Sequence, residues 1–523
     1  MLITDILARN QRMYGTEIAL VEREPAKNKR AEISWATFDQ QANRMANFLI
    51  GGGVSKGDRV VQLMSNCLEW LPIYFGILRT GALAVPLNFR FDANNIKRCV
   101  ETAEGKVLIF GVEFIDRIVT VKTDLDKFVQ RYIFVGPAES MPDFAESYQD
   151  IQKGGNTADP KVSLEISDDA GLYFTSGTTG KPKAILLTHR NLEFSCYVEN
   201  QHHKQTHDDN FLCIPPLYHT GAKMHWFGNF VVGAKAVILK GINPQWILQA
   251  ISEEHVTIVW LLVPWAMDIL TAIENKEIDL SNYSLDQWRL MHIGAQPVPP
   301  SLIGQWKQVF PQHEYDTNYG LTESTGPGCV HLGLENMHKI GAIGVPGFDW
   351  EVKIVDDHQH LVARGDPGEL AIRGPGVMKN YYRNPEATQS VMIDGWLLTG
   401  DIARQDNDGF IWLVDRKKDV IIYGGENVYP VEIEDFLQTH DAIHDVAVIG
   451  LPNQRLGEIV TAVIKVKAGH SLSKEALQQF CETLPRYKRP RVTIFGDVPR
   501  NPTGKIEKPK LRQQYASKGE KPD

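Results

Sequence analysis

The stretch from Thr175 to Lys183 constrains the fold more than any other, because it sets a polar, glycine-rich segment between two apolar runs. Residues 172–174 precede it and residues 184–187 follow it, and both runs have the composition of strands. A loop between two strands is therefore predicted. Its glycine N–H groups, hydroxyls and ammonium groups supply hydrogen-bond donors and positive charge without bulk, which suits a chain of phosphates. The candidate phosphate ligands are Thr175, Ser176, Gly177, Thr178, Thr179, Gly180 and Lys183.

Two other interpretations of this loop compete with phosphate binding. A Walker-type loop needs Ser or Thr directly after Gly-Lys and then a helix, whereas Pro182 follows Lys181 here and a strand follows the loop. A flexible polar surface turn is the usual identity of a Ser/Thr/Gly cluster, and this segment alone leaves that alternative open.

The first 170 residues alternate helix and strand patterns. Helical periodicity covers residues 35–50 and 67–79, and strand patterns cover residues 59–63 and 82–85. Such alternation is typical of an α/β fold with crossover helices and a largely parallel sheet. At 523 residues the chain is too long for one ordinary core, so we expect a large body and at least one separate domain.

Charge, cysteine spacing and hydropathy exclude several classes of protein. The net charge of −9 argues against nucleic-acid binding. The six cysteines have no paired spacing, which fits reduced thiols in a cytosolic protein. The N-terminus lacks a signal pattern, and the longest uncharged apolar run, about residues 257–267, is too short to span a bilayer. We therefore expect a cytoplasmic protein without an integral membrane segment.

The segment 316–323, Asp-Thr-Asn-Tyr-Gly-Leu-Thr-Glu, is much more specific than the strand and turn at residues 289–297. Tyr319 offers an aromatic face for an adenine ring, and Thr322 offers a hydroxyl for a phosphate. Glu323 offers a carboxylate for Mg²⁺, a hard cation that prefers oxygen ligands. Without this context Glu323 would be an ordinary exposed acid.

Two further segments suit the remaining parts of a nucleotide. A strand predicted over residues 289–293 ends at a glycine, and a glycine there lets the backbone approach a flat ring. Asp401 follows a strand pattern over residues 396–400, and its carboxylate suits both ribose hydroxyls. A plain turn residue is the alternative for Asp401.

The last hundred residues form a predicted small α+β domain behind a charged linker. A charged stretch begins at Asp415, and its lack of apolar periodicity is also typical of any exposed linker. Gly424 and Gly425 follow it. Lys505 stands on a Gly/Pro-rich loop that presents a single ammonium group. Helices are predicted from about residue 431 and over residues 473–484, and strands over residues 445–449, 459–466 and 492–495.

In this order, the motifs closely resemble those of the adenylate-forming superfamily, which includes acyl-CoA and aryl-CoA synthetases, peptide-synthetase adenylation domains and beetle luciferases. The resemblance covers essentially the whole chain. It implies an α/β fold in which residues 1–414 form a large AMP-binding body of mixed sheets and helices. Residues 415–420 would form the hinge, and residues 421–523 a small, mobile α+β domain.

The resemblance also implies roles for residues at matching positions. Lys505 matches the catalytic lysine, Lys418 the hinge residue and His219 the gate beside the acyl group. Glu323 matches the ligand of Mg²⁺, and Thr322 the hydroxyl on the phosphate. Nucleotide or coenzyme A contacts are implied for the loop residues named above and for Gly294, Ala295, Gln296, Thr317, Asn318, Tyr319, Gly320, Asp401, Arg416, Gly424 and Gly425.

The helix expected after His219 carries unusual side chains for such a family. Relatives usually have aliphatic residues where Lys223, His225 and Trp226 stand, so these residues and Gly221 are candidates for the wall of the acyl pocket. Polar groups there favour an acid with a polar or anionic far end, because a buried lysine needs a partner. A solvent-facing Lys223 is an equally good alternative.

Three histidines stand upstream, after a helix that Thr188 is expected to cap and that is expected to run to about Asn200. His202, His203 and His207 could form a metal site. No acidic residue or cysteine partner lies near them in the sequence, so a solvated loop is the preferred interpretation.

The implied activity is that of an ATP-dependent carboxylic acid–CoA ligase, with ATP, Mg²⁺ and coenzyme A as cofactors and a small carboxylic acid as substrate. A carboxylate would attack the α-phosphate of ATP to give an acyl-adenylate and pyrophosphate, and the thiol of coenzyme A would then release AMP. An adenylating enzyme that loads a carrier protein and a luciferase-like relative are the alternatives. The acid stays open among fatty, aromatic, alicyclic and dicarboxylic acids. The oligomeric state stays open too, with a homodimer as one option.

Overall fold

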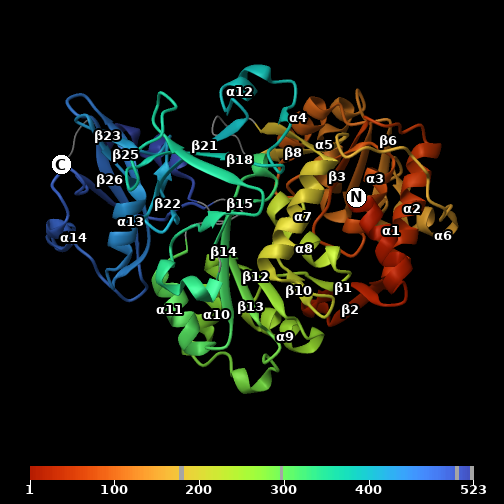
Figure 1. The fold of residues 1–523 in the computed structure, drawn as a ribbon, viewed down its shortest axis with the longest axis horizontal. Coiled ribbons are helices and arrows are strands. Elements are labelled where there is room, and N and C mark those ends of the chain that lie inside the picture. Colours follow the sequence, from red (N-terminus) through yellow and green to blue (C-terminus); the bar gives the residue numbers. More distant parts are fainter. Residues whose placement is uncertain (176–181, 295–297, 332, 501–505, 519–523) are drawn as a thin grey trace.

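The structure is a computed structural model that describes residues 1–175, 182–294, 298–331, 333–500 and 506–518. Four β-sheets with helices packed against them build the described chain (Figure 1). The C-terminal strands and helices, drawn in blue, form a lobe at one end of a larger body.

An eight-stranded sheet contains the two strands that flank the predicted phosphate loop. Its strand order is β19-β9-β8-β4-β3-β5-β6-β7, and in this order the strands from β8 to β7 run parallel, as the α/β alternation predicts. β8 and β9 pair antiparallel, with Thr175 opposite Lys183. The strands are β3 (Arg59–Leu63), β4 (Leu83–Pro86), β5 (Val107–Gly111), β6 (Arg131–Val135), β7 (Glu146–Ser147), β8 (Asp169–Thr175), β9 (Lys183–Thr188) and β19 (Asn380–Tyr381).

A nine-stranded sheet carries the segments predicted to bind the nucleotide base. Its order is β16-β15-β14-β13-β12-β10-β11-β1-β2, with parallel pairs at the centre and antiparallel pairs at both edges. The strands are β1 (Ile18–Glu24), β2 (Lys29–Ser34), β10 (Asn210–Cys213), β11 (Lys235–Leu239), β12 (Ile258–Leu262), β13 (Leu290–Gly294), β14 (Glu314–Gly320), β15 (Pro327–His331) and β16 (Val345–Pro346).

The two large sheets share one apolar core. Along β5, Val107 and Ile109 enter this shared core, whereas Leu108 and Phe110 enter a second core on the outer side of the sheet. Strand side chains alternate between faces, so both faces of each sheet are covered. The helices with residues in the shared core are α1 (Ile3–Tyr14), α2 (Trp35–Gly51), α3 (Trp70–Arg79), α6 (Tyr148–Gly154), α7 (His189–His203) and α8 (Thr220–Val231).

Other helices cover the outer faces of these sheets. The eight-stranded sheet is covered by α4 (Ala93–Ala103) and α5 (Ile115–Leu125), and the nine-stranded sheet by α9 (Pro244–Glu254), α10 (Val263–Glu274) and α11 (Pro300–Val309).

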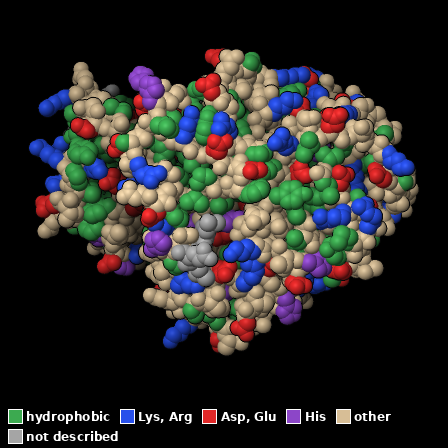
Figure 2. All heavy atoms as spheres, in the orientation of Figure 1, with side chains coloured by type: hydrophobic (Ala, Val, Ile, Leu, Met, Phe, Trp, Pro, Cys, Tyr) green, Lys and Arg blue, Asp and Glu red, His purple; other side chains and the backbone are tan. Residues whose placement is uncertain are grey.

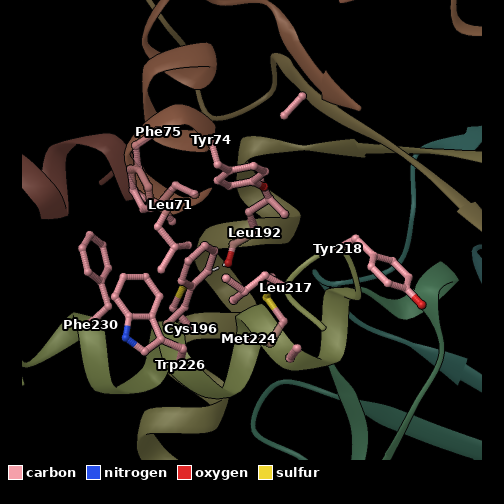
Figure 3. Packing of buried hydrophobic residues seen from close by; sticks show 14 of the residues in the cluster. Leu71, Tyr74, Phe75, Leu192, Cys196, Leu217, Tyr218, Met224, Trp226 and Phe230 are labelled. Atoms are coloured by element: carbon pink, nitrogen blue, oxygen red, sulfur yellow. Dashed lines mark hydrogen bonds between the residues drawn. The ribbon is translucent and has the colours of Figure 1, made fainter. Parts of the chain in front are cut away.

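Aromatic side chains join the central helices α3 and α8, and Leu192 and Cys196 of α7 belong to the same core (Figure 3). Trp226 and Phe230 are one turn apart on α8, and their rings lie 5.0 Å apart. The Phe230 ring lies 5.2 Å from that of Phe75 on α3. Large rings in such contact bury more apolar area per residue than aliphatic side chains, so they anchor this layer.

A third sheet connects the body to the C-terminal lobe. It contains β17 (Glu351–Val355), β18 (Gly368–Arg373), β20 (Met392–Ile393), β21 (Trp396–Gln405) and β22 (Ile411–Arg416), with the short helix α12 (Pro385–Gln389) between β19 and β20. β21 continues through Asp401, so the prediction that Asp401 follows a strand is wrong. Gly400 has φ +73°, a conformation that glycine adopts without strain, and the strand therefore passes this point as part of the sheet.

The C-terminal lobe has its own sheet and its own apolar cores. Its elements are β23 (Ile421–Tyr423), β24 (Glu426–Val428), α13 (Pro430–Gln438), β25 (Ile443–Asn453), β26 (Gly457–Val466), α14 (Lys474–Phe480), β27 (Val492–Phe495) and α15 (Lys508–Tyr515). Two core clusters consist only of residues from Ile421 onward. This α+β arrangement agrees with the helices and strands predicted for this part of the chain.

The charged surface, the cysteines and the length of the helices can be compared with the expectations from composition. Acidic and basic side chains are interspersed over the face in Figure 2. All six cysteines are free thiols, and five of them are buried. Among the described residues, no helix combines the length and the apolar character that crossing a bilayer requires.

Candidate active site

A crevice of about 350 Å³ opens where β21 meets β22. The pairing of the two strands sets Asp401 directly opposite Arg416, and the Arg416 Nε lies 3.3 Å from Asp401 Oδ1. Asp401 is buried, whereas the Arg416 side chain is partly exposed. A carboxylate fixed by a guanidinium at the edge of a cavity is well placed to accept hydrogen bonds from a ligand. The crevice is lined by Thr399, Gly400, Asp401, Arg416, Lys417 and Lys418.

Tyr319 of β14 reaches the same carboxylate from the neighbouring sheet. Its hydroxyl donates a hydrogen bond of 2.6 Å to Asp401 Oδ2. Burial, reinforced by the nearby Asp401 carboxylate, raises the pKa of the Tyr319 phenol well above its usual range, so the hydroxyl stays a donor. Tyr319 therefore joins, from a distant part of the sequence, the two predicted nucleotide-binding residues that β21 and β22 place opposite each other.

Glu323 lies in a single 3₁₀ turn, Thr322–Ser324, that follows β14. Its carboxylate is half-buried, and Oε1 accepts a hydrogen bond of 2.9 Å from the hydroxyl of Tyr381 in β19. The ammonium group of Lys183 lies 4.7 Å from the centre of the same tyrosine ring. Tyr381 thus links the predicted magnesium ligand to the end of the predicted phosphate loop.

The other predicted nucleotide contacts on described residues lie along β8, β13 and β14. Thr175 ends β8, Gly294 ends β13, and Thr317 and Asn318 lie on β14. A Cβ on Gly320 would approach the Gly326 carbonyl oxygen to 2.5 Å, so only glycine fits there.

Several predicted contacts lie outside the described residues. These are the loop residues Ser176, Gly177, Thr178, Thr179 and Gly180, the base-binding residues Ala295 and Gln296, and the catalytic Lys505.

The predicted hinge, residues 415–420, begins in the last two residues of β22 and contains a buried carboxylate near each end. Lys418 itself is exposed and lines the crevice. Asp415 accepts a hydrogen bond of 2.9 Å from the backbone N–H of Val431, and burial raises its pKa to about 6. Asp419 binds Arg512 of α15 at 2.8 Å. The C-terminal lobe is therefore tied to both ends of this short segment.

Gly424 and Gly425 form the two-residue turn between β23 and β24. Their φ values are +59° and +93°, and a hairpin turn with two left-handed residues favours glycine at both positions. Both residues are exposed, and a Cβ on Gly425 would meet nothing within 4 Å. The turn thus presents a backbone surface without side chains, on the C-terminal lobe.

On the predicted acyl side, His219 precedes the first residue of α8, and its ring lies 4.7 Å from the Tyr218 ring. Gly221 stands in the first turn of α8. A Cβ on Gly221 would come within 3.2 Å of the Trp260 ring, and the Gly221 carbonyl accepts a hydrogen bond of 2.7 Å from His225 Nδ1. The His225 ring stacks on Trp260, with 4.3 Å between the ring centres.

Lys223 is fully buried, so the solvent-facing alternative for this residue is wrong. Its ammonium group donates to the carbonyl of Leu217 at 3.0 Å and lies 4.4 Å from the centre of the Tyr173 ring. The rings of Trp70 and Tyr74 are also within cation–π distance. Burial lowers the pKa of Lys223 well below its usual range. Apolar and aromatic neighbours, which the sequence could not place beside it, hold this side chain inside the core.

Trp226 packs against the rings of Phe38 and Phe230 in the shared core (Figure 3). Its assignment to the wall of the acyl pocket stays a prediction.

The expectation of a solvated loop at His202 and His203 is wrong. α7 extends to His203, and the His203 side chain is buried with Nε2 3.0 Å from Asp316 Oδ2. His202 Nε2 lies 3.0 Å from the carbonyl oxygen of His331. The acidic partner comes from β14, far along the chain, and for this reason the local sequence did not reveal it. His207 lies apart from this group, 2.9 Å from Glu17.

His203 belongs to a buried cluster of three imidazoles and two carboxylates, which we call the imidazole cluster: Glu199, His203, His225, His292 and Asp316. Burial alone would raise the pKa of Asp316, but His203 and His292 outweigh it and hold that pKa well below the usual range. Burial raises the pKa of Glu199 to about 7. One carboxylate is thus stabilised as an anion inside the protein, whereas the other is not.

Sequence reasoning missed two kinds of site residue. Tyr381 stands in a two-residue strand outside every recognised motif, and no local pattern marks it. His292 lies in a strand whose neighbours are apolar, and a polar residue at such a position was the one available signal.

Comparison with known proteins places most of the chain in one family. The family model of AMP-binding enzymes matches residues 7–382, and that of the AMP-binding enzyme C-terminal domain matches residues 432–505. A long-chain-fatty-acid–CoA ligase of Mycobacterium tuberculosis is 31% identical over 501 residues, covering 94% of this chain and 95% of that protein. Feruloyl-CoA synthase of an Amycolatopsis species is 32% identical over 490 residues, covering 92% and 94%.

The similarity to solved structures is equally extensive. ATP-bound MatB from Rhodopseudomonas palustris superposes with a TM-score of 0.88 at 26% identity, and the match covers 99% of both chains. The large body, the small C-terminal lobe and their mixed α/β elements therefore have counterparts along nearly the whole chain.

Proposed function

Because the chain belongs to the family of AMP-binding enzymes and is an AMP-forming acid–CoA ligase, we propose that its body holds ATP and the organic acid while its C-terminal lobe supplies the catalytic lysine. Lys505 neutralises the negative charge that builds on the α-phosphate as the carboxylate attacks. Preorganised cations are the main catalytic need of such a phosphoryl-group reaction. The products of this first half are an acyl-adenylate and pyrophosphate.

The convergence of Tyr319, Asp401 and Arg416 supports this assignment most strongly. Their side chains are joined by contacts of 2.6 and 3.3 Å at the edge of one crevice, although they lie on three different strands. In this crevice Asp401 binds the ribose hydroxyls, because its carboxylate can accept from both. Arg416 contacts ribose and phosphate, and Tyr319 gives its ring face to the adenine.

The donors at the end of β14 suit Mg²⁺. The Glu323 carboxylate is half-buried and oriented by the Tyr381 hydroxyl, and the Thr322 hydroxyl precedes it in the chain. Oxygen donors beside a phosphate site are the ligands that this cation prefers. When bound, Mg²⁺ supplies positive charge against the phosphates. Glu323 would hold the ion, Tyr381 would orient Glu323, and Lys183 and the 175–183 loop would hold the β- and γ-phosphates.

The second half of the reaction needs a different surface at the acyl group. A thiol must approach the carbonyl from the side that Lys505 occupies, so the C-terminal lobe turns about Lys418 between the two halves. The turn brings the Gly424–Gly425 hairpin to the site, where the absence of side chains leaves room for the thiol arm of coenzyme A. His219 gates the acyl side. A cytoplasmic location fits the six unpaired thiols.

Separate assays of the two half-reactions test the role of Lys505. In Lys505→Ala, pyrophosphate release on mixing ATP with the acid is expected to fall about 10²- to 10³-fold, the loss typical of one preorganised charge-stabilising group. Thioester formation from a supplied acyl-adenylate is expected to be retained. Lys510→Ala, an exposed lysine on α15, is the matched control and should preserve both halves. Equal loss of both halves in Lys505→Ala would contradict the proposal.

A panel of fatty, aromatic, alicyclic and dicarboxylic acids identifies the substrate. AMP production that requires both the acid and coenzyme A is expected for one of these classes. Pyrophosphate release without any thioester on coenzyme A would favour the carrier-loading alternative instead. Light scattering on the same preparation distinguishes a monomer from a homodimer.

A further inference from the structure

Three neighbouring strands place side chains in a row beneath the central helices. Parallel register sets Trp260 of β12 opposite His292 of β13, and His292 opposite Asp316 of β14. The adjacent Met291 and Ile293 alternate to the outer face, where they pack in the core under α9–α11. His292 and Asp316 therefore face the layer that contains α7 and α8, and His292 Nδ1 lies 2.5 Å from Asp316 Oδ1.

The helices supply the other members of the imidazole cluster. Glu199 and His203 are one turn apart on α7, and His225 stands on α8. His225 Nε2 lies 2.7 Å from His292 Nε2, and His203 Nε2 lies 3.3 Å from His292 Nδ1. One ligand nitrogen from each of the three histidines lies within 4.8 Å of the other two, and all three residues are buried.

The hydrogen bonds of the Nδ1 atoms determine what the Nε2 atoms present. His225 Nδ1 lies 2.7 Å from the Gly221 carbonyl oxygen, which only accepts, so this nitrogen donates. His292 Nδ1 donates in the same way to the Asp316 carboxylate. A neutral imidazole that donates at Nδ1 carries a lone pair at Nε2. The two Nε2 lone pairs thus lie 2.7 Å apart, and the Asn318 amide approaches His225 Nε2 to 3.2 Å. A cation or a shared proton between the two nitrogens would remove their repulsion.

The carboxylate of Glu199 offers a further oxygen ligand close to the Nε2 atoms of His203 and His225. Its side chain is fully buried, and Oε1 accepts a hydrogen bond of 2.8 Å from the Asn318 amide. Oε2 has no hydrogen-bond partner within the described parts of the chain. It lies 3.6 Å from His225 Nε2 and 3.7 Å from His203 Nε2. A buried carboxylate oxygen without a partner is costly, and a cation beside it would offset that cost.

We propose that His203, His225 and His292 bind one divalent transition-metal ion of the zinc class, with Glu199 as a neighbouring carboxylate ligand. Zinc takes imidazole nitrogen and carboxylate oxygen at about 2.0–2.2 Å in a tetrahedron, which sets its ligand atoms roughly 3.3 Å apart. The separations of 2.7, 3.6 and 3.7 Å within the cluster bracket that spacing. Imidazole donors select zinc over magnesium, which prefers oxygen alone.

The surroundings of His225 and His292 match those of metal ligands, whereas His203 Nε2 lies 3.0 Å from Asp316 Oδ2 and would exchange that contact for the ion. Metal-bound imidazoles usually donate their other N–H to a carboxylate or a backbone carbonyl, and here Asp316 and the carbonyl of Gly221 receive those bonds. The ion would join α7, α8 and β13 inside the body, next to the strand that carries the nucleotide motif. The site stands on its own donors and does not depend on the roles proposed for the nucleotide crevice.

Metal analysis of the full-length, tag-free protein tests the proposal without any activity assay. Protein from zinc-supplemented cells is expected to contain about one zinc ion per chain by plasma mass spectrometry. X-ray absorption should show nitrogen and oxygen ligands at about 2.0–2.2 Å. After removal of the metal by a chelator, Co²⁺ should bind in a one-to-one ratio and give the visible absorption of a tetrahedral site. A protein that contains no zinc and takes up no Co²⁺ would overturn the proposal, and the two nitrogens would then share a proton.

Single substitutions of the proposed ligands test where the ion binds. His225→Gln and His292→Gln are expected to weaken Co²⁺ binding at least 100-fold, and Asp316→Asn, which acts through His292, about 10- to 100-fold. His207→Gln is the matched control, because His207 also contacts a carboxylate but lies outside the cluster, and it should bind Co²⁺ as the unchanged protein does. Circular dichroism establishes that each variant is folded. If a variant does not fold, the ligand distances from X-ray absorption of the unchanged protein test whether histidine and carboxylate bind the ion. Co²⁺ binding that is equally strong in His225→Gln and His292→Gln would place the ion elsewhere and contradict the assignment.

Discussion

The nucleotide crevice and the imidazole cluster are both polar, but they differ in how their polar groups are satisfied. In the crevice, Asp401 stands at the edge of a cavity with the partly exposed Arg416, so a ligand can reach both groups. In the imidazole cluster, Asp316 is enclosed by histidines that are themselves buried. An open polar site can exchange water for ligand, whereas a closed one must find its partners within the protein or in a bound ion. The crevice should therefore govern catalysis, and the cluster should govern stability.

Asp316→Ala is expected to have the largest effect, and the effect should be on stability. Removal of this carboxylate leaves several buried imidazoles without their partner, and loss of one member of a buried charged network costs about 3–5 kcal/mol of unfolding free energy. The shift of the urea denaturation midpoint measures it. Asp208→Ala, an exposed carboxylate near the end of α7, is the control and should change stability by less than about 0.5 kcal/mol. A loss below about 1 kcal/mol in Asp316→Ala would mean that the cluster is not structural.

Asp401→Ala should reverse this pattern, with a large effect on activity and a smaller one on stability. Loss of the bonds to both ribose hydroxyls is expected to lower kcat/KM for ATP about 10²- to 10³-fold, because hydrogen bonds to a charged group are each worth about 1.5–3 kcal/mol. Pyrophosphate release at varied ATP concentration measures it. Asp408→Ala removes an exposed carboxylate in the turn between β21 and β22 and should leave the rate unchanged. If Asp401→Ala unfolds the protein as readily as Asp316→Ala, the contrast between the two regions fails.

Asp415 in the hinge beside the crevice is a buried carboxylate whose ionised form burial disfavours, and the pH dependence of stability tests this. Its pKa is raised to about 6, so between about pH 4 and 6 the folded state binds a proton that the unfolded state has released. The unfolding free energy should therefore fall as the pH rises through this window, by about 3 kcal/mol for a shift of about two pKa units. Asp415→Asn should lack this component. Denaturation midpoints from pH 4 to 7 measure the difference, and parallel curves for the two proteins would contradict the prediction.

Tyr381→Phe should have the smallest effect, and it tests how Glu323 is oriented beside the crevice. The variant keeps the ring beside Lys183 but loses the hydroxyl that orients Glu323. A loss of about 1.5 kcal/mol corresponds to roughly a tenfold fall in kcat/KM at low Mg²⁺, which excess Mg²⁺ should partly restore. Tyr382→Phe, the next residue, is the control. A fall that Mg²⁺ does not relieve would show that Tyr381 acts through something other than the metal ligand.

Much of the fold was readable from local patterns. The helix at α2, the strands β3 and β27 and the Thr188 cap of α7 lie where periodicity and capping residues predicted them, because such signals act over a few residues. The strand was predicted to end before Asp401 but continues to Gln405, with Gly400 at a positive φ within it. Asp316, the acidic partner of His203, could not be predicted from local sequence because it lies on a strand far along the chain.

The sequence alone was sufficient to infer the family, the reaction class and the order of the nucleotide-binding motifs. Each of these inferences depends on residues in short contiguous segments. Only the tertiary structure placed Tyr381 beside Glu323, Lys223 among aromatic rings and three histidines around one point. Those contacts depend on the register of parallel strands and on which helices cover them. Register is set by the packing of the whole sheet, and no local stretch of sequence encodes it.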